Sequence, residues 1–238
     1  MVISGSGSLP GGDYNEEVHI SGSGVINGNV SCTEFSISGS GEVQGNLRCT
    51  GNTKISGSGS VKGNLEADET SISGSGTVSG NVKGNRCNVS GMFEAGGIMV
   101  NELNVSGKIK AGGDISAENA VIHGMIEAAG LINAEKFDAA FDYDSSAEAI
   151  GGSFIHIRRK GLAAGFFSRL FKGNKGGCFT VSGSIEGDVI DIEYTTAESV
   201  VGREVIIGPG CKIGKLTYVE KINISPEAEV GSVEKAEV

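Results

Sequence analysis

The chain has 238 residues, a formal net charge of −10 and 40 glycines. The negative charge argues against a nucleic-acid partner, because phosphate binding needs a basic surface. With three prolines, no Gly-X-Y period and 38% apolar residues, the chain is neither collagen nor a disordered linker. We therefore expect the glycines to serve a packed architecture with little room for side chains.

The N-terminus, MVISGSG, has neither the basic region nor the apolar region of a signal peptide. No stretch approaches the roughly 18 apolar residues of a membrane-spanning helix. Five cysteines without a Cys-x-x-Cys motif suit a reducing compartment. These features predict a cytoplasmic protein, either free or peripheral on the inner face of the membrane.

The first half of the chain repeats one pattern with a period of about 17 residues. The motif ISGSG begins at Ile3, Ile20, Ile37, Ile55 and Ile72, and shorter versions begin at Val89, Val105 and Ile122. Alternating apolar and small residues indicate strands, and Gly-Asn pairs indicate turns. Residues 1–130 lack helical spacing. The pattern predicts an all-β fold, a right-handed parallel β-helix with three strands and three corners per rung.

In such a coil each residue lies over its counterpart one rung away, at about 4.8 Å. We expect Gly22 and Gly24 to point inward between aliphatic columns. The predicted inward columns are Ile20, Ile37, Ile55 and Ile72, and Ile26, Val43, Val61 and Val78. A ladder of side-chain amides is predicted for Asn29, Asn46, Asn64 and Asn81.

The cysteines follow the same phase. Cys32 and Cys49 occupy equivalent positions on neighbouring rungs, and Cys87 falls near the position of Phe35. The first two are close enough for a disulfide in principle. We interpret them as small apolar core residues, because the compartment is predicted to be reducing.

The pattern divides the chain into four segments. We predict N-terminal rungs over 1–133, an irregular transition over 134–154, a basic amphipathic insert over 155–177 and C-terminal rungs over 178–238. Residues 155–176 hold six basic residues and no acidic one, and helical spacing places their apolar residues on one side. The predicted membrane or partner contacts are Arg158, Arg159, Lys160, Leu162, Phe166, Phe167, Arg169, Leu170, Phe171 and Lys172.

Two interpretations of the insert stay open. Its apolar side could enter an anionic membrane while the cations meet headgroups. Alternatively, the apolar side folds back onto the last rungs as a cap, with the cations in solvent. Gly161 and Gly165 weaken the prediction of a helix.

Sequence signals of catalysis are missing. His19, His123 and His156 lie far apart and in different phases of the repeat. Neither a His-Glu-x-x-His motif, a paired Cys motif nor a Walker loop is present. We expect a non-enzymatic protein with no cofactor or metal, whose assembly does not depend on nucleotide.

The SG-x-I-x-G-x-I rungs and the ending IEGDVIDIEY…VVGREVIIGPGCKIG resemble the bactofilins, polymer-forming cytoskeletal proteins of bacteria. The resemblance implies head-to-tail assembly into homopolymeric filaments without nucleotide, often at the inner membrane face. It further implies scaffolding of envelope, shape or motility proteins. The chain departs from the family in lacking a disordered N-terminal tail and in carrying a long late insert.

A solenoid leaves an unpaired strand edge and an open apolar cross-section at each end. Because Ile3 opens a rung immediately, Val2 and Ile3 are the predicted polymer interface.

Two other classes remain as alternatives. IIGPGCKIG at 206–214 resembles a hexapeptide repeat and suggests a left-handed β-helix acyltransferase, although the pattern occurs once. Rows of serines at Ser21/Ser23, Ser38/Ser40, Ser56/Ser58 and Ser73/Ser75 suggest a surface- or ice-binding solenoid. Filament formation without substrate separates a scaffold from both, whereas acyl transfer or thermal hysteresis would favour one of them.

Overall fold

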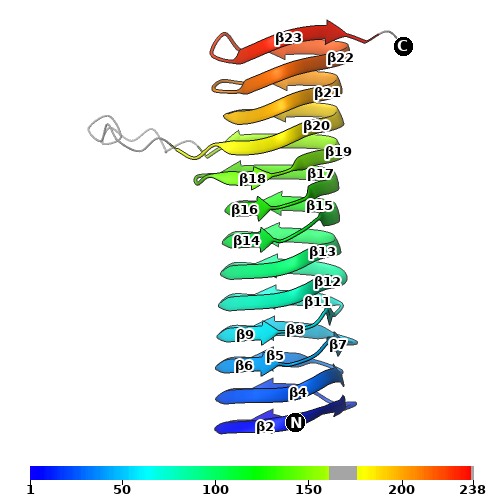
Figure 1. The fold of residues 1–238 in the computed structure, drawn as a ribbon, viewed down its shortest axis with the longest axis vertical. Coiled ribbons are helices and arrows are strands. Elements are labelled where there is room, and N and C mark those ends of the chain that lie inside the picture. The colour runs from blue at the N-terminus through cyan, green and yellow to red at the C-terminus, as the bar shows by residue number, and fades with distance from the viewer. Residues whose placement is uncertain (161–175, 237–238) are drawn as a thin grey trace, which may run out of the picture.

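The computed structural model describes residues 1–160 and 176–236, and these residues form strands stacked into one long column (Figure 1). In chain order the strands are β1 (Val2–Ile3), β2 (Ser6–Asp13), β3 (Val18–Ile20), β4 (Ser23–Cys32), β5 (Phe35–Ile37), β6 (Ser40–Val43), β7 (Leu47–Cys49), β8 (Asn52–Ile55), β9 (Ser58–Val61), β10 (Leu65–Glu66), β11 (Glu69–Ile72), β12 (Ser75–Val89), β13 (Met92–Val105), β14 (Lys108–Ala111), β15 (Ile115–Ile122), β16 (Met125–Ala128), β17 (Leu131–Phe141), β18 (Ser145–Ala147), β19 (Ala149–Arg159), β20 (Phe179–Ile192), β21 (Thr195–Ile207), β22 (Lys212–Ile224) and β23 (Glu229–Lys235).

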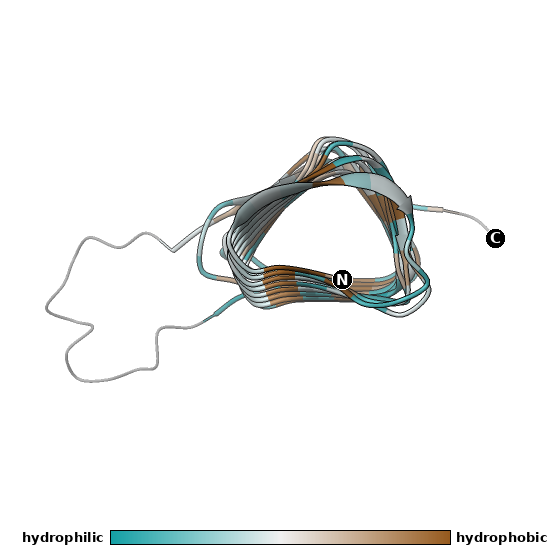
Figure 2. Cartoon of the chain, turned by 90° about the horizontal axis from the view of Figure 1, so that it is seen from below, coloured by the Kyte–Doolittle hydropathy of each residue, from teal (hydrophilic) through white to brown (hydrophobic). Residues whose placement is uncertain are grey.

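Each rung runs along three faces, so the column has a triangular outline when seen along its axis (Figure 2). Face 1 includes residues 23–26, face 2 includes residues 30–32 and face 3 includes residues 35–37, and later rungs repeat this order. The strands of neighbouring rungs pair in parallel, and their paired residues are mostly one period apart, as for Ile20 with Ile37. The fold is therefore a β-solenoid of about 13 turns, as the sequence pattern predicted.

The predicted inward columns are confirmed. Ile20, Ile26, Ile55 and Val61 are fully buried, and their stacked equivalents are exposed by 1% or less. Gly24 is buried as predicted, but Gly22 is not inward and lies at the corner between faces 3 and 1. A Cβ on Gly22 would meet the carbonyl oxygen of the glycine one rung earlier. Close stacking of backbones at the corner therefore explains this glycine.

The asparagine ladder forms, with a different hydrogen-bond pattern from the predicted one. The side-chain oxygen of Asn29 accepts the backbone N–H of Asn46 at 2.8 Å. Asn46 accepts from Asn64, and Asn64 from Asn81, at the same distance. Each amide therefore satisfies the backbone of the next rung instead of the next side chain.

The irregular transition predicted for 134–154 is corrected by ordered strands in this range. β17, β18 and β19 continue the rungs, with Phe137 paired to Ile155. Phe137 and Phe141 of β17 pack edge-on against Phe179 of β20, with ring centroids 6.2 and 6.0 Å apart. Large buried aromatic side chains fill this section of the core, and they hid the Ser-Gly pattern on which the prediction relied.

The solenoid continues on both sides of the undescribed segment 161–175. β19 ends on face 3, and β20 begins on face 1, where Phe179 stacks over Ser145 of β18. The expected insert thus starts later than 155, because Ile155 and Ile157 are buried in β19. Of the predicted contact residues, Leu162, Phe166, Phe167, Arg169, Leu170, Phe171 and Lys172 lie outside the described residues.

Candidate functional site: the two ends and the outer faces

At the N-terminal end, the first rung exposes its outer edge. Val2 pairs with His19 and Ile3 with Ile20, so β1 has a partner on one side. Ile3 is buried against the core, whereas Val2 is 63% exposed. Within the described ranges no strand pairs with the other edge of β1. Backbone donors and acceptors of the first rung are therefore free to pair with another strand.

Glycines of the first rung have room that glycines of later rungs lack. A Cβ on Gly22, Gly39, Gly57 or Gly74 would collide with a carbonyl oxygen of the preceding rung. Gly5 occupies the same corner, and a Cβ there meets nothing within 4 Å. Similarly, a Cβ on Gly24 would lie 2.9 Å from Ile3 Cδ1, whereas one on Gly7 lies 3.8 Å from the nearest atom. Nothing in the described chain requires glycine at these two positions.

The C-terminal end is open along one face. β23 covers faces 1 and 2 of β22, where Val230 lies over Ile213 and Val233 over Leu216. Residues 222–224 of β22 lie on face 3, and no described strand covers their outer edge. Ile224 is exposed at this edge, and Val233 is exposed on face 2. A groove of about 510 Å³ adjoins this edge, with Tyr218, Ile222 and Lys235 among its lining residues. The repeat pattern did not identify this groove, although the end of the Ile column at Ile224 is a signal for it.

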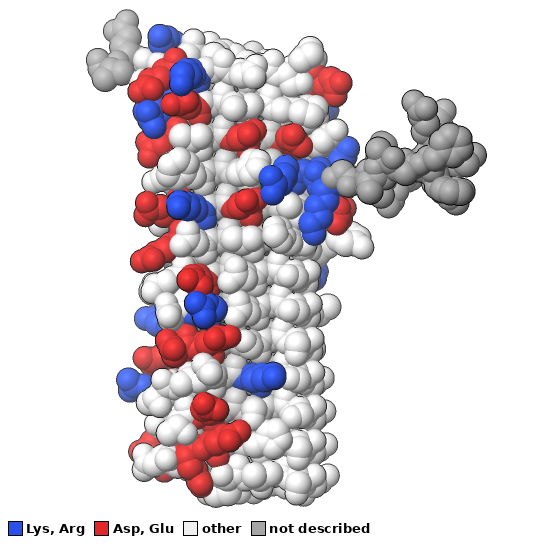
Figure 3. Space-filling view, turned by 180° about the vertical axis from the view of Figure 1, so that it is seen from behind, with Lys and Arg blue, Asp and Glu red and all other residues white. Residues whose placement is uncertain are grey.

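Basic residues gather near the end of β19, and Figure 3 shows blue side chains grouped where the grey trace leaves the column. The guanidinium carbon of Arg159 lies 3.4 Å from the ring centroid of Tyr194. Arg158 forms an ion pair with Asp138 at 3.8 Å, and Lys160 Nζ donates to the carbonyl of His123 at 2.6 Å. These three predicted contact residues are thus held against the solenoid at the edge of the undescribed segment.

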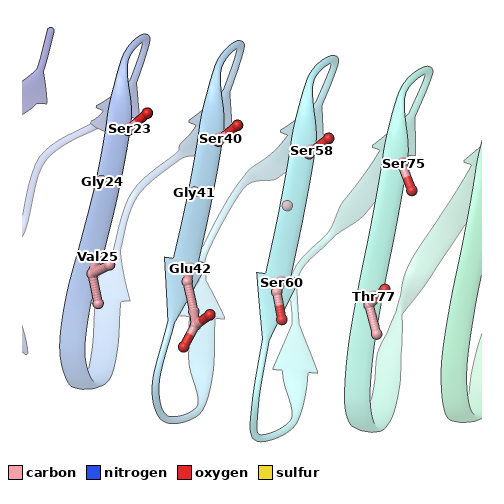
Figure 4. A pocket seen from close by; sticks show the side chains of 11 residues that line it. Ser23, Gly24, Val25, Ser40, Gly41, Glu42, Ser58, Ser60, Ser75 and Thr77 are labelled. Atoms are coloured by element: carbon pink, nitrogen blue, oxygen red, sulfur yellow. The ribbon is translucent and has the colours of Figure 1, made fainter. Parts of the chain in front are cut away.

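Small polar side chains cover face 1 of the first rungs. Ser40, Ser58 and Ser75 stack in register beside a shallow concavity of about 440 Å³ (Figure 4). Glu42 is the one ionisable side chain among the residues that line it. Ser40 and Ser58 therefore lie on the outer surface, as the alternation in the sequence predicted.

Charged side chains pair between rungs along one edge of the column (Figure 3). Arg86 lies between Glu69 and Glu102, and its Nε is 2.7 Å from Glu102 Oε2. The hydrogen bond and the charge of Arg86 lower the pKa of the Glu102 carboxyl below its usual 4.5. These side chains are largely solvent-exposed, so each pair adds little to the stability of the solenoid.

The described residues contain no cluster of three or more His, Cys, Asp or Glu side chains that could hold a metal ion. Within the same ranges no helix is long and apolar enough to cross a membrane. The hexapeptide-like run at 206–214 includes a corner between β21 and β22, where Gly210 has a φ of 70°. The features that stand out in the described part are therefore surfaces and ends.

Comparison with known proteins agrees with this picture. A family model described as "Bactofilin: Polymer-forming cytoskeletal" matches residues 3–83 and 42–133. The uncharacterized protein YhbF of Bacillus subtilis (strain 168) is 38% identical over 102 residues, which cover 42% of this chain and 40% of YhbF. YhbE of the same organism is 46% identical over 46 residues, 19% of each chain.

The chain thus spans less than half the length of either relative. No solved structure matches it. The two family matches together extend over residues 3–133, more than half of the chain, and they fall on the Ser-Gly rungs that build the solenoid. This chain belongs to the bactofilin family of polymer-forming cytoskeletal proteins.

Proposed function

We propose that this chain is a structural subunit that assembles end to end, without nucleotide, into filaments. The family supports polymer formation, and the observation that carries the mode of assembly is the pair of glycines in the first rung. In later rungs a corner glycine is required because another rung lies directly beneath it. Gly5 is also a glycine at this corner, although no described rung lies beneath it. The first rung therefore carries the glycine of an interior rung.

A second copy supplies the missing neighbour. Its terminal rung would bring backbone carbonyls under Gly5 and a side chain under Gly7, as earlier rungs do for Gly22 and Gly24. The stacking would also cover Val2 and complete the hydrogen bonding of β1. Burial of apolar residues at about 25 cal/mol per Å² would favour this contact.

The two ends complement each other in a head-to-tail arrangement. The described chain begins with β1 on face 3 and ends with β23 on face 2. The β1 strand of one copy would therefore pair with the uncovered edge of residues 222–224 in the next copy. Ile3 would then stack on Ile224 and continue the buried column of face 3.

Attachment and clients are further parts of the proposal. The cations Arg158, Arg159 and Lys160 lie together at the end of β19, and the sequence beyond them adds basic and apolar residues. We infer that this region contacts the anionic inner face of a membrane. The filament would scaffold proteins of the envelope, of cell shape or of motility. The proposal assigns no catalytic residue.

Electron microscopy of the purified 238-residue protein, with and without nucleotide, tests assembly. We expect filaments in both conditions. The Gly5→Val variant should remain folded with an unchanged melting temperature and yield monomers or short oligomers. The matched Gly22→Val variant should lose stability, because its side chain collides inside the monomer. Ile3→Asp should also block assembly, since it places a charge at the interface.

Filaments of Gly5→Val that match the parent protein in length would contradict the interface. A parent protein that stays monomeric at high concentration, with no filaments under either condition, would contradict the function.

A further inference from the structure

Cys32 and Cys49 form a stacked pair inside the solenoid. They are in-register partners on β4 and β7, and their sulfur atoms lie 3.2 Å apart. Both thiols are free and both side chains are buried. A disulfide needs Cα atoms about 4.4–6.8 Å apart, and neighbouring strands lie about 4.8 Å apart. The backbone thus already has a spacing that permits the bond, and the sulfurs need to approach through side-chain rotation.

The two sulfurs have different environments. Cys49 Sγ is hydrogen-bonded to Cys32 Sγ and also accepts the hydroxyl of Thr53 at 3.3 Å. The hydrogen bond from Cys32, with that from Thr53, lowers the pKa of the Cys49 thiol, whereas burial opposes this change. The hydrogen bond to Cys49, with burial, raises the pKa of Cys32. Because the Thr53 hydroxyl donates to Cys49 Sγ, the thiolate is favoured on Cys49, which is the sulfur that attacks an oxidant.

Two other cysteines provide contrast within the same core. Cys87 stacks between Thr70 and Leu103, and burial raises the pKa of its thiol to about 12. Cys211 is buried and its Sγ lies 3.3 Å from the carbonyl oxygen of Ile192, with burial raising its pKa to about 11. The stacked neighbours of Cys87 are not thiols, so a buried cysteine of this core does not by itself form a pair.

We propose that Cys32 and Cys49 are an oxidative modification site, at which a small-molecule disulfide converts the pair into a bond between two rungs. The Cys49 thiolate attacks one sulfur of the oxidant RSSR, forming a mixed disulfide and releasing RS⁻. The Cys32 thiolate then attacks the Cys49 sulfur and releases the second RS⁻. The protein loses two electrons and two protons, and the oxidant is reduced to two thiols.

The bond would latch two rungs near the N-terminal end. It closes the loop between residues 32 and 49 and limits the separation of β4 from β7 during local unfolding. Since both sulfurs are buried, oxidation has to follow brief local opening, and a slow reaction is expected.

The test uses the full chain treated with excess glutathione disulfide, then denatured, alkylated and mapped by mass spectrometry. We expect peptides containing Cys32 and Cys49 to become cross-linked and to lose alkylation together, while Cys87 and Cys211 remain alkylatable. The melting temperature should rise and return to its original value with dithiothreitol. In Cys32→Ser, the glutathione adduct should accumulate on Cys49 because the second step is blocked.

Chain oxidised in denaturant serves as the control for reactivity, since all five cysteines are accessible there. If Cys32 and Cys49 in the folded chain remain alkylatable after half-buried Cys178 has reacted fully, the site is refuted. Cross-links that join other cysteines in the folded protein would refute it equally.

Discussion

Asn29 accepts the backbone N–H of Asn46 through its side-chain oxygen at 2.8 Å, and this bond joins two rungs at a corner. Identical bonds join Asn46 to Asn64 and Asn64 to Asn81. Corners are where β-sheet hydrogen bonds are interrupted, so backbone groups there need other partners. The ladder supplies them and links consecutive rungs where the strands turn.

Replacing Asn46 by Ala should therefore destabilise the solenoid by about 1 kcal/mol, because the backbone N–H of Asn64 loses its protein acceptor. Chemical denaturation measures the change. Asn101→Ala is the control, since its exposed amide bonds only another side chain, Asn85. A cost for Asn101→Ala as large as that for Asn46→Ala would argue against a special role for the corner ladder.

Ile55→Asp should cost about 4 kcal/mol or more, because it buries an unpaired charge in the face 3 column. Rungs on both sides should loosen, since each rung is stabilised by its neighbours. Ser58→Asp, on the outer side of β9, should change the unfolding free energy by less than about 0.5 kcal/mol. Equal melting of both variants would contradict the assigned inward and outward positions.

Mixing two blocked variants tests filament polarity. Ile3→Asp spoils the N-terminal end and Ile224→Asp spoils the exposed C-terminal end. In head-to-tail assembly each variant alone stays monomeric, and a mixture yields dimers that join the two intact ends. Size-exclusion chromatography with light scattering distinguishes the species. Dimers formed by each variant alone would instead indicate that like ends pair.

The Arg86–Glu102 pair predicts a small dependence of stability on pH. The folded state lowers the pKa of Glu102 from its usual 4.5, so the folded carboxyl binds a proton less readily than the unfolded one. Its contribution is therefore present above pH 4.5 and is lost as pH falls through the lower pKa of the folded state. Thermal unfolding of the parent protein and of Glu102→Gln is measured at a series of pH values. The parent protein should be the more stable of the two near neutral pH, and this difference in stability should shrink as the pH falls. A difference in stability that grows as the pH falls would contradict the prediction.

The sequence of the insert predicts membrane binding by its apolar residues. Changing Phe166, Phe167, Leu170 and Phe171 together to Ser should abolish flotation with anionic liposomes while the melting temperature stays unchanged. Each apolar residue contributes up to about 1.5–3 kcal/mol if fully buried, and a polymer multiplies weak contacts. A melting temperature that collapses in this variant, with no flotation of the parent protein, would favour the capping interpretation.

The sequence by itself determined the solenoid, its period and the inward columns at Ile20 and Ile26. A strict repeat places equivalent residues in the same environment on every rung. The position of a residue within the repeat therefore predicts its position in the fold. The pattern failed where large side chains replaced the small ones. Phe137 and Phe141, which pack against Phe179, lie in regular rungs within the range predicted to be irregular.

Only the tertiary structure decided which atoms of neighbouring rungs are in contact. Gly22 and Gly5 are the same residue in the same motif, and stacking alone shows that one has a rung beneath it and the other has none. The repeat likewise aligned Cys32 with Cys49, but the 3.2 Å between their sulfurs depends on the side-chain rotamers. The hydrogen bond from the Thr53 hydroxyl to Cys49 Sγ is also seen only in the folded chain. Contacts between rungs depend on distances across the stack, which a one-dimensional pattern does not contain, because it fixes which residues face each other and leaves their separation to packing.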